Sequence, residues 1–279
     1  MQGVMNLVKA PIKVAAKAVL GGRTYAKFTS IKSRNLQKRL LAERGSLTLS
    51  RRLVERLGTH VMTGPFKGLQ YPMAALVSRH AGPKLLGTYE RELHPVIESR
   101  NWREYSYVVD IGCAEGYYAV GIAKTFHQKV LGFDPEPREK ELCRQMAALN
   151  EVSSMVVLGD WADARTLEEL CAERRCFVLS DCEGYEAELF DRRSVQALRV
   201  SDVLIEIHEQ QKGDLSSPLR ELFQPTHETK IITFRRREIG DFPEFKSLGE
   251  DAQLALDEHR TDDQPWLWCQ SRQSAFRPK

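Results

Sequence analysis

From residue 86 onward, short apolar runs alternate with segments of helical periodicity. Such alternation indicates parallel strands joined by helices that cover both faces of one sheet. Five runs come first, at residues 105–110, 129–134, 154–160, 176–181 and 201–209. Helical patterns at 216–225 and 249–260 then alternate with two further runs, at 230–238 and 265–270. We therefore expect an α/β fold built on a mostly parallel sheet.

Acidic residues stand at the ends of the first three runs, at Asp110, Asp134 and Asp160. In open α/β sheets ligands bind at the carboxyl edge of the strands, where such an acid can accept hydrogen bonds from both ribose hydroxyls of an adenosine. Gly112 and Gly116 follow the first run and let a ligand approach the backbone. Their spacing differs from G-x-G-x-x-G, which disfavours a nicotinamide-dependent reductase.

The third run ends at Asp160 beside Trp161, which together offer an acceptor for an adenine amino group and an aromatic face. Taken singly, each of the three aspartates has an alternative reading as a helix cap or a turn residue. Three acids at successive strand ends are the stronger signal, because parallel strands bring their carboxyl ends to one edge.

The fourth run opens into "SDCEGYEAELF". With "VVDIGCAEGYYA", "GFDPE" and "LGDW", it resembles the class I methyltransferases that depend on S-adenosylmethionine (SAM), and its D-x-E-G-x-E element resembles their FkbM-type branch. The likeness covers residues 86 to about 210 and implies a Rossmann-like sheet of seven strands. Two positions depart from the pattern: Ala114 replaces the middle glycine of the commoner loop, and Ser180 precedes Asp181 where a lysine and an aliphatic residue are frequent.

The resemblance also implies a set of cofactor-binding residues. Asp110, Gly112, Ala114 and Gly116 would line the methionine part of SAM. Asp134 would hold the ribose, and Asp160 with Trp161 would hold the adenine. An upstream segment, "LGTYERELHP", would close over the cofactor, with Tyr89 and Glu90 facing the site. Glu90 would balance the positive charge of the ammonium or sulfonium group. Alternatively, Glu90 belongs to a solvated helix face with its charged neighbours.

Ionisable groups gather after the fourth and fifth runs, and we predict that His208, Asp181 and Glu183 are catalytic. His208 is the preferred base because its ordinary pKa lies near neutrality, and Asp181 would orient His208 or the substrate. Two alternatives stay open: Mg²⁺ held by Asp181, Glu183 and Glu209, which is not favoured, or a structural His208. Four later residues are candidates for the acceptor pocket or for packing: His227, His259, Arg260 and Trp266.

The FkbM resemblance implies O-methylation of a small hydroxylated metabolite, sugar or natural product. A nucleic-acid methyltransferase is an alternative, although "SDCEGYE" is not the N-P-P-Y or D-P-P-Y element used on base amino groups. A non-catalytic scaffold with a SAM-binding fold, which docks through the basic start of the chain, is the other alternative.

The first 56 residues hold 13 Lys and Arg against Glu43 and Glu55, which leaves 28 basic and 36 acidic residues for the remainder. Apolar and lysine positions near the start recur at helical spacing. We predict a basic helical extension over residues 1–75 and a methyltransferase domain over residues 76–279. The extension would meet an anionic membrane surface or an acidic partner, with nucleic acid disfavoured, or it would pack on the body as a helical cap.

Six cysteines occur without a C-x-x-C pair, which indicates buried thiols in a reducing compartment. No uncharged apolar run reaches about 18 residues, so we expect no membrane-spanning helix. A cytoplasmic location is the expectation from these two features.

Overall fold

The computed structural model describes residues 48–78, 80–209, 213–260 and 264–273. The chain divides into two compact units, of which the second comprises Leu49–Lys279. The basic arm at residues 1–47, with the helical pattern predicted there, lies outside the described residues.

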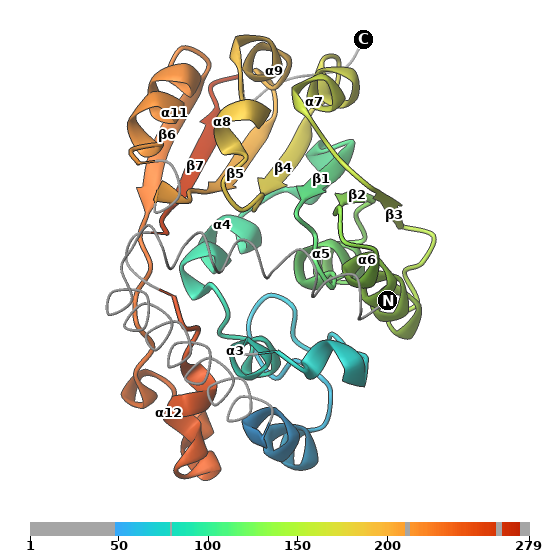
Figure 1. Cartoon of the computed structure of the whole chain (residues 1–279), viewed down its shortest axis with the longest axis vertical. Coiled ribbons are helices and arrows are strands. Elements are labelled where there is room, and N and C mark those ends of the chain that lie inside the picture. The colour runs from blue at the N-terminus through green and yellow to red at the C-terminus, as the bar shows by residue number, and fades with distance from the viewer. Residues whose placement is uncertain (1–47, 79, 210–212, 261–263, 274–279) are drawn as a thin grey trace, which may run out of the picture. The chain divides into compact units, whose positions relative to one another are not determined.

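Seven strands form one sheet in the order β3-β2-β1-β4-β5-β7-β6 (Figure 1). Their bounds are β1 Tyr107–Ile111, β2 Val130–Phe133, β3 Val156–Gly159, β4 Cys176–Ser180, β5 Asp202–Glu206, β6 His227–Ile232 and β7 Trp266–Ser271. The pairs among β1 to β5 are parallel, whereas β7 is antiparallel to both β5 and β6. The sheet is therefore mixed rather than mostly parallel, because the last strand returns into the gap between β5 and β6.

Helices connect the strands in the described part of the chain. The α-helices are α3 Ala81–Leu86, α4 His94–Glu98, α5 Tyr117–Phe126, α6 Pro137–Leu149, α7 Ala164–Cys171, α8 Glu186–Leu189, α9 Arg192–Ala197, α11 Ser216–Phe223 and α12 Asp251–Leu256. The 3-10 helices are η1 Met73–Leu76, η2 Arg91–Leu93, η3 Trp102–Glu104, η4 Ile239–Asp241 and η5 Pro243–Leu248. A further helix covers residues 48–57.

The sheet separates two hydrophobic cores, because successive side chains of a strand point to opposite faces. Val108 of β1 belongs to the core that contains Ile122 of α5. Its neighbour Val109 belongs to the other core, with Leu167 of α7. Figure 1 shows α7, α9 and α11 along one face of the sheet and α5 and α6 along the other. Covered on both faces, the strands β4 and β5 are wholly buried, as their apolar sequences predict.

Side chains from residues 49–75 also enter the first core. Leu53, Phe66 and Tyr71 are each at most 2% exposed and belong to the core that contains α5. A side chain at Gly121 of α5 would meet the ring of Phe66 at 2.7 Å, so this packing is close. The division of the chain at residue 75 stays a prediction, but residues 49–75 are part of the packed body.

The run predicted as a strand at 230–238 ends earlier than expected. Strand β6 finishes at Ile232, and Arg235, Arg236 and Arg237 follow it outside the sheet.

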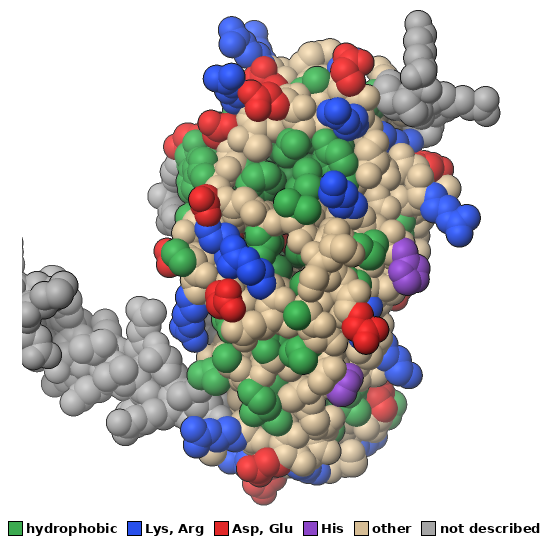
Figure 2. Space-filling view, turned by 90° about the vertical axis from the view of Figure 1, so that its right-hand side faces the viewer, with side chains coloured by type: hydrophobic (Ala, Val, Ile, Leu, Met, Phe, Trp, Pro, Cys, Tyr) green, Lys and Arg blue, Asp and Glu red, His purple; other side chains and the backbone are tan. Residues whose placement is uncertain are grey.

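Within the described ranges no helix has both the length and the apolar character to cross a membrane. On the face shown in Figure 2, basic and acidic side chains are interspersed among uncharged ones.

Candidate functional site

A cavity of about 340 Å³ lies over the carboxyl ends of β1, β2, β3 and β4. Seven of the predicted site residues line it: Gly112, Ala114, Asp134, Asp160, Trp161, Asp181 and Glu183. They come from four segments that are separated in the sequence and meet because the parallel strands end at one edge. The cavity therefore brings the predicted cofactor residues into one wall with two of the three predicted catalytic residues.

Asp134 ties the loops after β1 and β2 together. Its Oδ2 accepts a hydrogen bond of 2.9 Å from the Ala114 amide, and its Oδ1 accepts one of 2.8 Å from the Glu136 amide. Ala114 has φ 44°, so it keeps the left-handed backbone that a glycine adopts more easily. A carboxylate has about four lone-pair sites, so Asp134 retains acceptor capacity toward the cavity.

Asp160 and Trp161 form the outer part of the wall. The Asp160 side chain is 88% exposed and pairs with Lys140, whose hydrogen bond holds the pKa of Asp160 below its ordinary value. Trp161 is 52% exposed, and its ring packs edge-on against Tyr185 with 4.8 Å between centroids. A half-exposed tryptophan beside a cavity provides an apolar face for a planar ligand.

Gly112 marks the closest approach of two loops in this wall. It has φ 82°, and a Cβ atom there would lie 1.8 Å from the carbonyl oxygen of Asp181. The Asp181 amide in turn donates a hydrogen bond of 2.9 Å to Ile111. Gly116 has φ 101° and faces Cys143 rather than the cavity, since a Cβ there would meet its Sγ at 2.7 Å. Only a glycine fits at position 112.

Asp110 is buried at the end of β1 and does not line the cavity. Neither of its carboxylate oxygens has a hydrogen-bond partner within the described ranges. Burial, with the negative charges of Asp181 and Asp134, raises the pKa of Asp110 to about 8. A buried carboxyl group without such partners is costly to ionise, which agrees with the raised pKa of Asp110.

His208 lies two residues beyond β5 and is 3% exposed. Its Nδ1 lies 2.6 Å from Oε1 of Glu186, and its Nε2 lies 3.6 Å from both Oδ1 of Asp181 and Oε2 of Glu183. An ionised carboxylate can only accept, so Nδ1 carries the proton that is donated to Glu186. The Nε2 atom therefore faces the two acids of the cavity wall.

The acids around His208 shift one another's protonation. Burial alone would lower the pKa of His208, but the hydrogen bond to Glu186 and the charges of Asp181, Glu186 and Glu183 raise it. Burial raises the pKa of Asp181 to about 6, against the hydrogen bond with Glu206. Burial and the charges of Asp181 and Glu90 also raise the pKa of Glu206. Shifted and mutually coupled acids around a histidine are typical of sites that transfer protons.

Glu90 is joined to this cluster through Arg260. The guanidinium of Arg260 pairs with Glu90 and with Glu206, and Glu90 also accepts a hydrogen bond from Tyr118. Glu90 is 1% exposed and has φ 48°, so it is a buried ion-pair residue and the solvated-face alternative is wrong. Tyr89 is 9% exposed and stacks on His80. Neither Tyr89 nor Glu90 lines the cavity.

Three side chains could together hold a metal ion: Asp181, Glu206 and His208, with ligand atoms within 4.8 Å of one another. This set differs from the predicted Mg²⁺ ligands, because Glu209 accepts a hydrogen bond of 2.6 Å from Ser216 and is turned toward that residue. The Nδ1 hydrogen bond to a buried carboxylate also orients many metal-bound histidines. The cluster is therefore compatible with either a base or a metal site.

The later candidate residues separate into two groups. Arg260 enters the cluster, whereas His227 is buried at the start of β6 with its Nε2 3.0 Å from the Ser201 carbonyl oxygen. His259 is half-exposed near Asp257, and Trp266 is a buried residue of the first core. The sequence pattern did not single out Glu186 or Glu206 as site residues, although Glu186 lies in the polar segment after β4 and Glu206 is the last residue of β5.

Comparisons with known proteins identify no family. No family model matches the chain, and no curated protein matches it. Solved structures overlap part of it at low identity, and three illustrate the range. An O-methyltransferase family protein from Burkholderia thailandensis has a TM-score of 0.35 and 17% identity over 70% of this chain and 60% of that one. TrmN from Thermus thermophilus has a TM-score of 0.42 and 16% identity, over 70% of this chain and 53% of that one. A TehB-like SAM-dependent methyltransferase from Corynebacterium glutamicum has a TM-score of 0.39 and 11% identity, over 65% of this chain and 87% of that one.

Proposed function

We propose that the chain is a SAM-dependent methyltransferase of class I, related to the FkbM-type branch, that methylates a hydroxyl group of a small molecule. The observation that carries the proposal is the cavity in which Asp134, Asp160 and Trp161 share a wall with Asp181 and Glu183. Acceptors for a ribose and an adenine thus lie beside a cluster suited to proton transfer.

The residues present fit the cofactor in three respects. Asp134 has acceptor capacity left for ribose hydroxyls, and the half-exposed Trp161 can contact an adenine ring. The buried Asp110 lacks partners and would be stabilised by a nearby cation such as the ammonium group of SAM. Glu90 is less available than the sequence suggests, because Arg260 already balances its charge. Bound SAM would supply an electrophilic methyl group.

In this proposal, His208 removes the proton from the acceptor hydroxyl. Glu186 fixes the ring and leaves Nε2 toward Asp181 and Glu183, the two acids that line the cavity. The arrangement of a carboxylate, an imidazole and a substrate hydroxyl is a recurring way to orient a base. Glu186 is therefore a positioning residue, a role that the sequence had suggested for Asp181.

The test is calorimetric titration of the protein with SAM and with S-adenosylhomocysteine. Either ligand should bind, and a hundredfold excess over Kd should stabilise the fold by about 2.7 kcal/mol. Asp134→Ala should weaken binding by about 1.5–3 kcal/mol, because hydrogen bonds to a charged group are lost. Glu173→Gln is the control, since this exposed residue precedes β4 at the opposite edge of the sheet. If neither ligand binds, the proposal is wrong.

A further inference from the structure

We propose a second ligand site, separate from the cavity above, that binds a phosphate-bearing small molecule. It is a hollow of about 500 Å³ between the start of η2 and the segment that follows β6. Its lining contains four arginines: Arg91, Arg235, Arg236 and Arg237. Two acids, Glu92 and Asp241, also line it.

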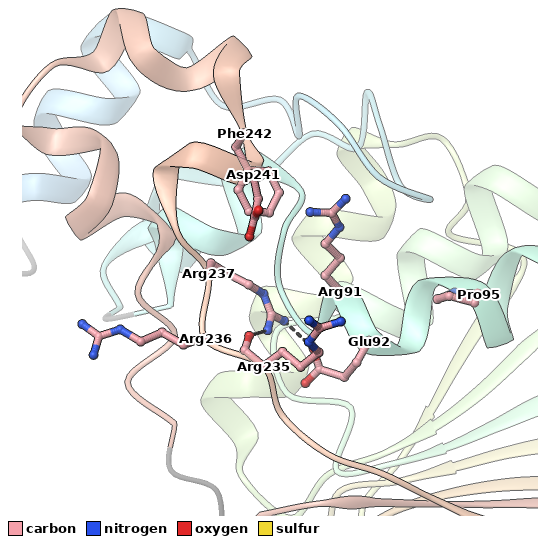
Figure 3. A pocket seen from close by; sticks show the side chains of 8 residues that line it. All are labelled: Arg91, Glu92, Pro95, Arg235, Arg236, Arg237, Asp241 and Phe242. Carbon is pink, nitrogen blue, oxygen red and sulfur yellow. Dashed lines mark hydrogen bonds and ion pairs between the residues drawn. The ribbon is translucent and has the colours of Figure 1, made fainter.

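The arginines reach the hollow from two segments that are more than 140 residues apart in the sequence. Figure 3 shows Arg91 on one side and Arg235 and Arg237 on the other, whereas Arg236 points away from them. The Arg91 guanidinium stacks over the ring of Phe242, with 4.5 Å between the guanidinium carbon and the ring centroid. This contact holds the Arg91 charge in a defined place.

One of these charges is already balanced. Arg237 is 5% exposed and pairs with Glu92 at 2.5 Å and with Glu258 at 2.7 Å. Its single positive charge is shared between the two acids, and burial raises the pKa of both Glu92 and Glu258, which reduces the negative charge that an anion would meet there. Asp241 is the remaining opposing charge in the lining.

The charges of Arg91 and Arg235 are not balanced in this way. Within the described part of the chain, no carboxylate lies at ion-pair distance from either guanidinium. Arg236 lies 3.6 Å from Glu238, in a pair so exposed that it contributes little. Two unpaired arginines thus face one hollow on a body that carries more acidic than basic residues.

A phosphate group matches this arrangement better than a lone carboxylate. The guanidinium fork donates two parallel hydrogen bonds to phosphate oxygens, and a dianion gains from two such groups on opposite sides. The volume leaves room for the rest of a small molecule beyond the phosphate. We assign the hollow to ligands such as sugar phosphates or nucleotides, whose shared chemistry is the phosphoryl group.

The site adjoins the cluster that contains Glu90 through one shared acid, Glu258. Glu258, which pairs with Arg237, also accepts a hydrogen bond of 3.1 Å from the Glu90 amide. Arg91 directly follows Glu90 in the sequence, so the segment that carries Glu90 forms a wall of the hollow. The hollow therefore touches the backbone that supports Glu90, but phosphate binding there does not depend on the proposed SAM chemistry.

Pyrophosphate titrated calorimetrically into the full-length protein tests the proposal. The double variant Arg91→Gln with Arg235→Gln should weaken binding at least tenfold, because both free guanidinium groups are lost. Arg165→Gln is the matched control: its side chain is 82% exposed on α7, outside the lining, and its removal should leave binding unchanged. Raising the salt concentration should weaken pyrophosphate binding to the unmodified protein, because salt screens the arginine charges.

Two results would overturn the proposal. One is the absence of pyrophosphate binding to the unmodified protein at millimolar concentration. The other is binding to the double variant as tight as to the unmodified protein, which would place the ligand elsewhere, for example on the basic arm. Both substituted side chains are exposed, and a thermal melt checks that the variant folds. SAM titration of the same samples reports separately on the proposed methyltransferase site.

Discussion

The Nδ1 atom of His208 lies 2.6 Å from Oε1 of Glu186, and the Glu186 side chain is wholly buried. The hydrogen bond holds the pKa of Glu186 below its ordinary value, although burial alone would raise it. Glu186 therefore stays ionised and fixes which nitrogen of His208 carries the proton. The opposite nitrogen is left facing Asp181 and Glu183.

Under the proposed function His208 is the general base, so replacing it by alanine should lower methyl transfer to a hydroxylated acceptor about 10²–10⁴-fold. SAM affinity should change little, since His208 does not line the cavity. His127→Asn is the control: this residue is exposed, and asparagine tolerates its left-handed backbone. Near-normal turnover in His208→Ala would exclude it as base. Activity that a chelator abolishes and Mg²⁺ restores would favour the metal alternative.

Glu186→Gln should lower the pKa of His208. The hydrogen bond to Glu186 is the largest contribution that raises this pKa, and the charges of Asp181 and Glu183 remain in the variant. Glu206, whose carboxylate lies 3.9 Å from Nε2 of His208, and its partner Arg260 are also unchanged. The chain has only seven histidines, so an NMR titration of the ring protons can follow His208 directly. An unaltered titration midpoint would contradict the positioning role of Glu186.

Asp110→Asn should flatten the dependence of stability on pH. The pKa of this carboxyl is raised by folding to about 8, so its protonated form favours the folded state. That contribution is fully present below about pH 4 and is lost as the pH rises toward 8. Relative to the unsubstituted protein, the variant should gain stability as the pH rises from about 4 to 8, by at most about 6 kcal/mol. Parallel curves of unfolding free energy against pH would refute this account.

Two truncations separate the basic arm from the packed body. Removing residues 1–47 should leave SAM affinity within a few-fold, because the cavity is built from residues 111–185. Removing residues 1–55 should also lower Tm, since Leu53 is fully buried and Arg52 pairs with Asp251. Loss of a buried leucine typically costs about 2–5 kcal/mol. Equal melting temperatures for the two truncations would show that the packing of Leu53 is dispensable. Binding to anionic vesicles by the full chain, but by neither truncated protein, would favour an anionic membrane surface as the partner of the arm.

Most of the sheet could be predicted from local sequence pattern. Each of the five leading apolar runs overlaps one of the strands β1 to β5, and only β1 extends past its run, by one residue to Ile111. Burial on both faces of the sheet demands such continuous apolar residues. The position of β7 between β5 and β6 could not be predicted, because strand order depends on contacts between distant segments. The run at 230–238 predicted a strand that is too long at its end, because Arg235, Arg236 and Arg237 leave the sheet after β6 and line a separate hollow.

The cavity wall was predictable for the same reason, since Asp134, Asp160 and Asp181 directly follow their strands. The ion pairs behind the wall could not be predicted from the sequence. Arg260 and Glu90 are 170 residues apart in the sequence, and local pattern gives no information on such a contact. Glu186 lies within the quoted D-x-E-G-x-E element, but its partner His208 is 22 residues away, in the segment that follows β5. Spacing alone therefore could not show that Glu186, rather than Asp181, holds the ring.

The contact between Gly112 and the Asp181 carbonyl oxygen, at which a Cβ atom would sit 1.8 Å away, limits how this protein can be engineered. A library that randomises position 112 should yield only glycine among folded clones, whatever ligand is used for selection. Trp161, which is half-exposed at the cavity rim, is the position at which diversity can be introduced without disturbing the backbone, whereas Asp160 pairs with the buried Lys140. Altered cofactor preference should therefore be sought at the rim of the cavity and not in its glycine loop.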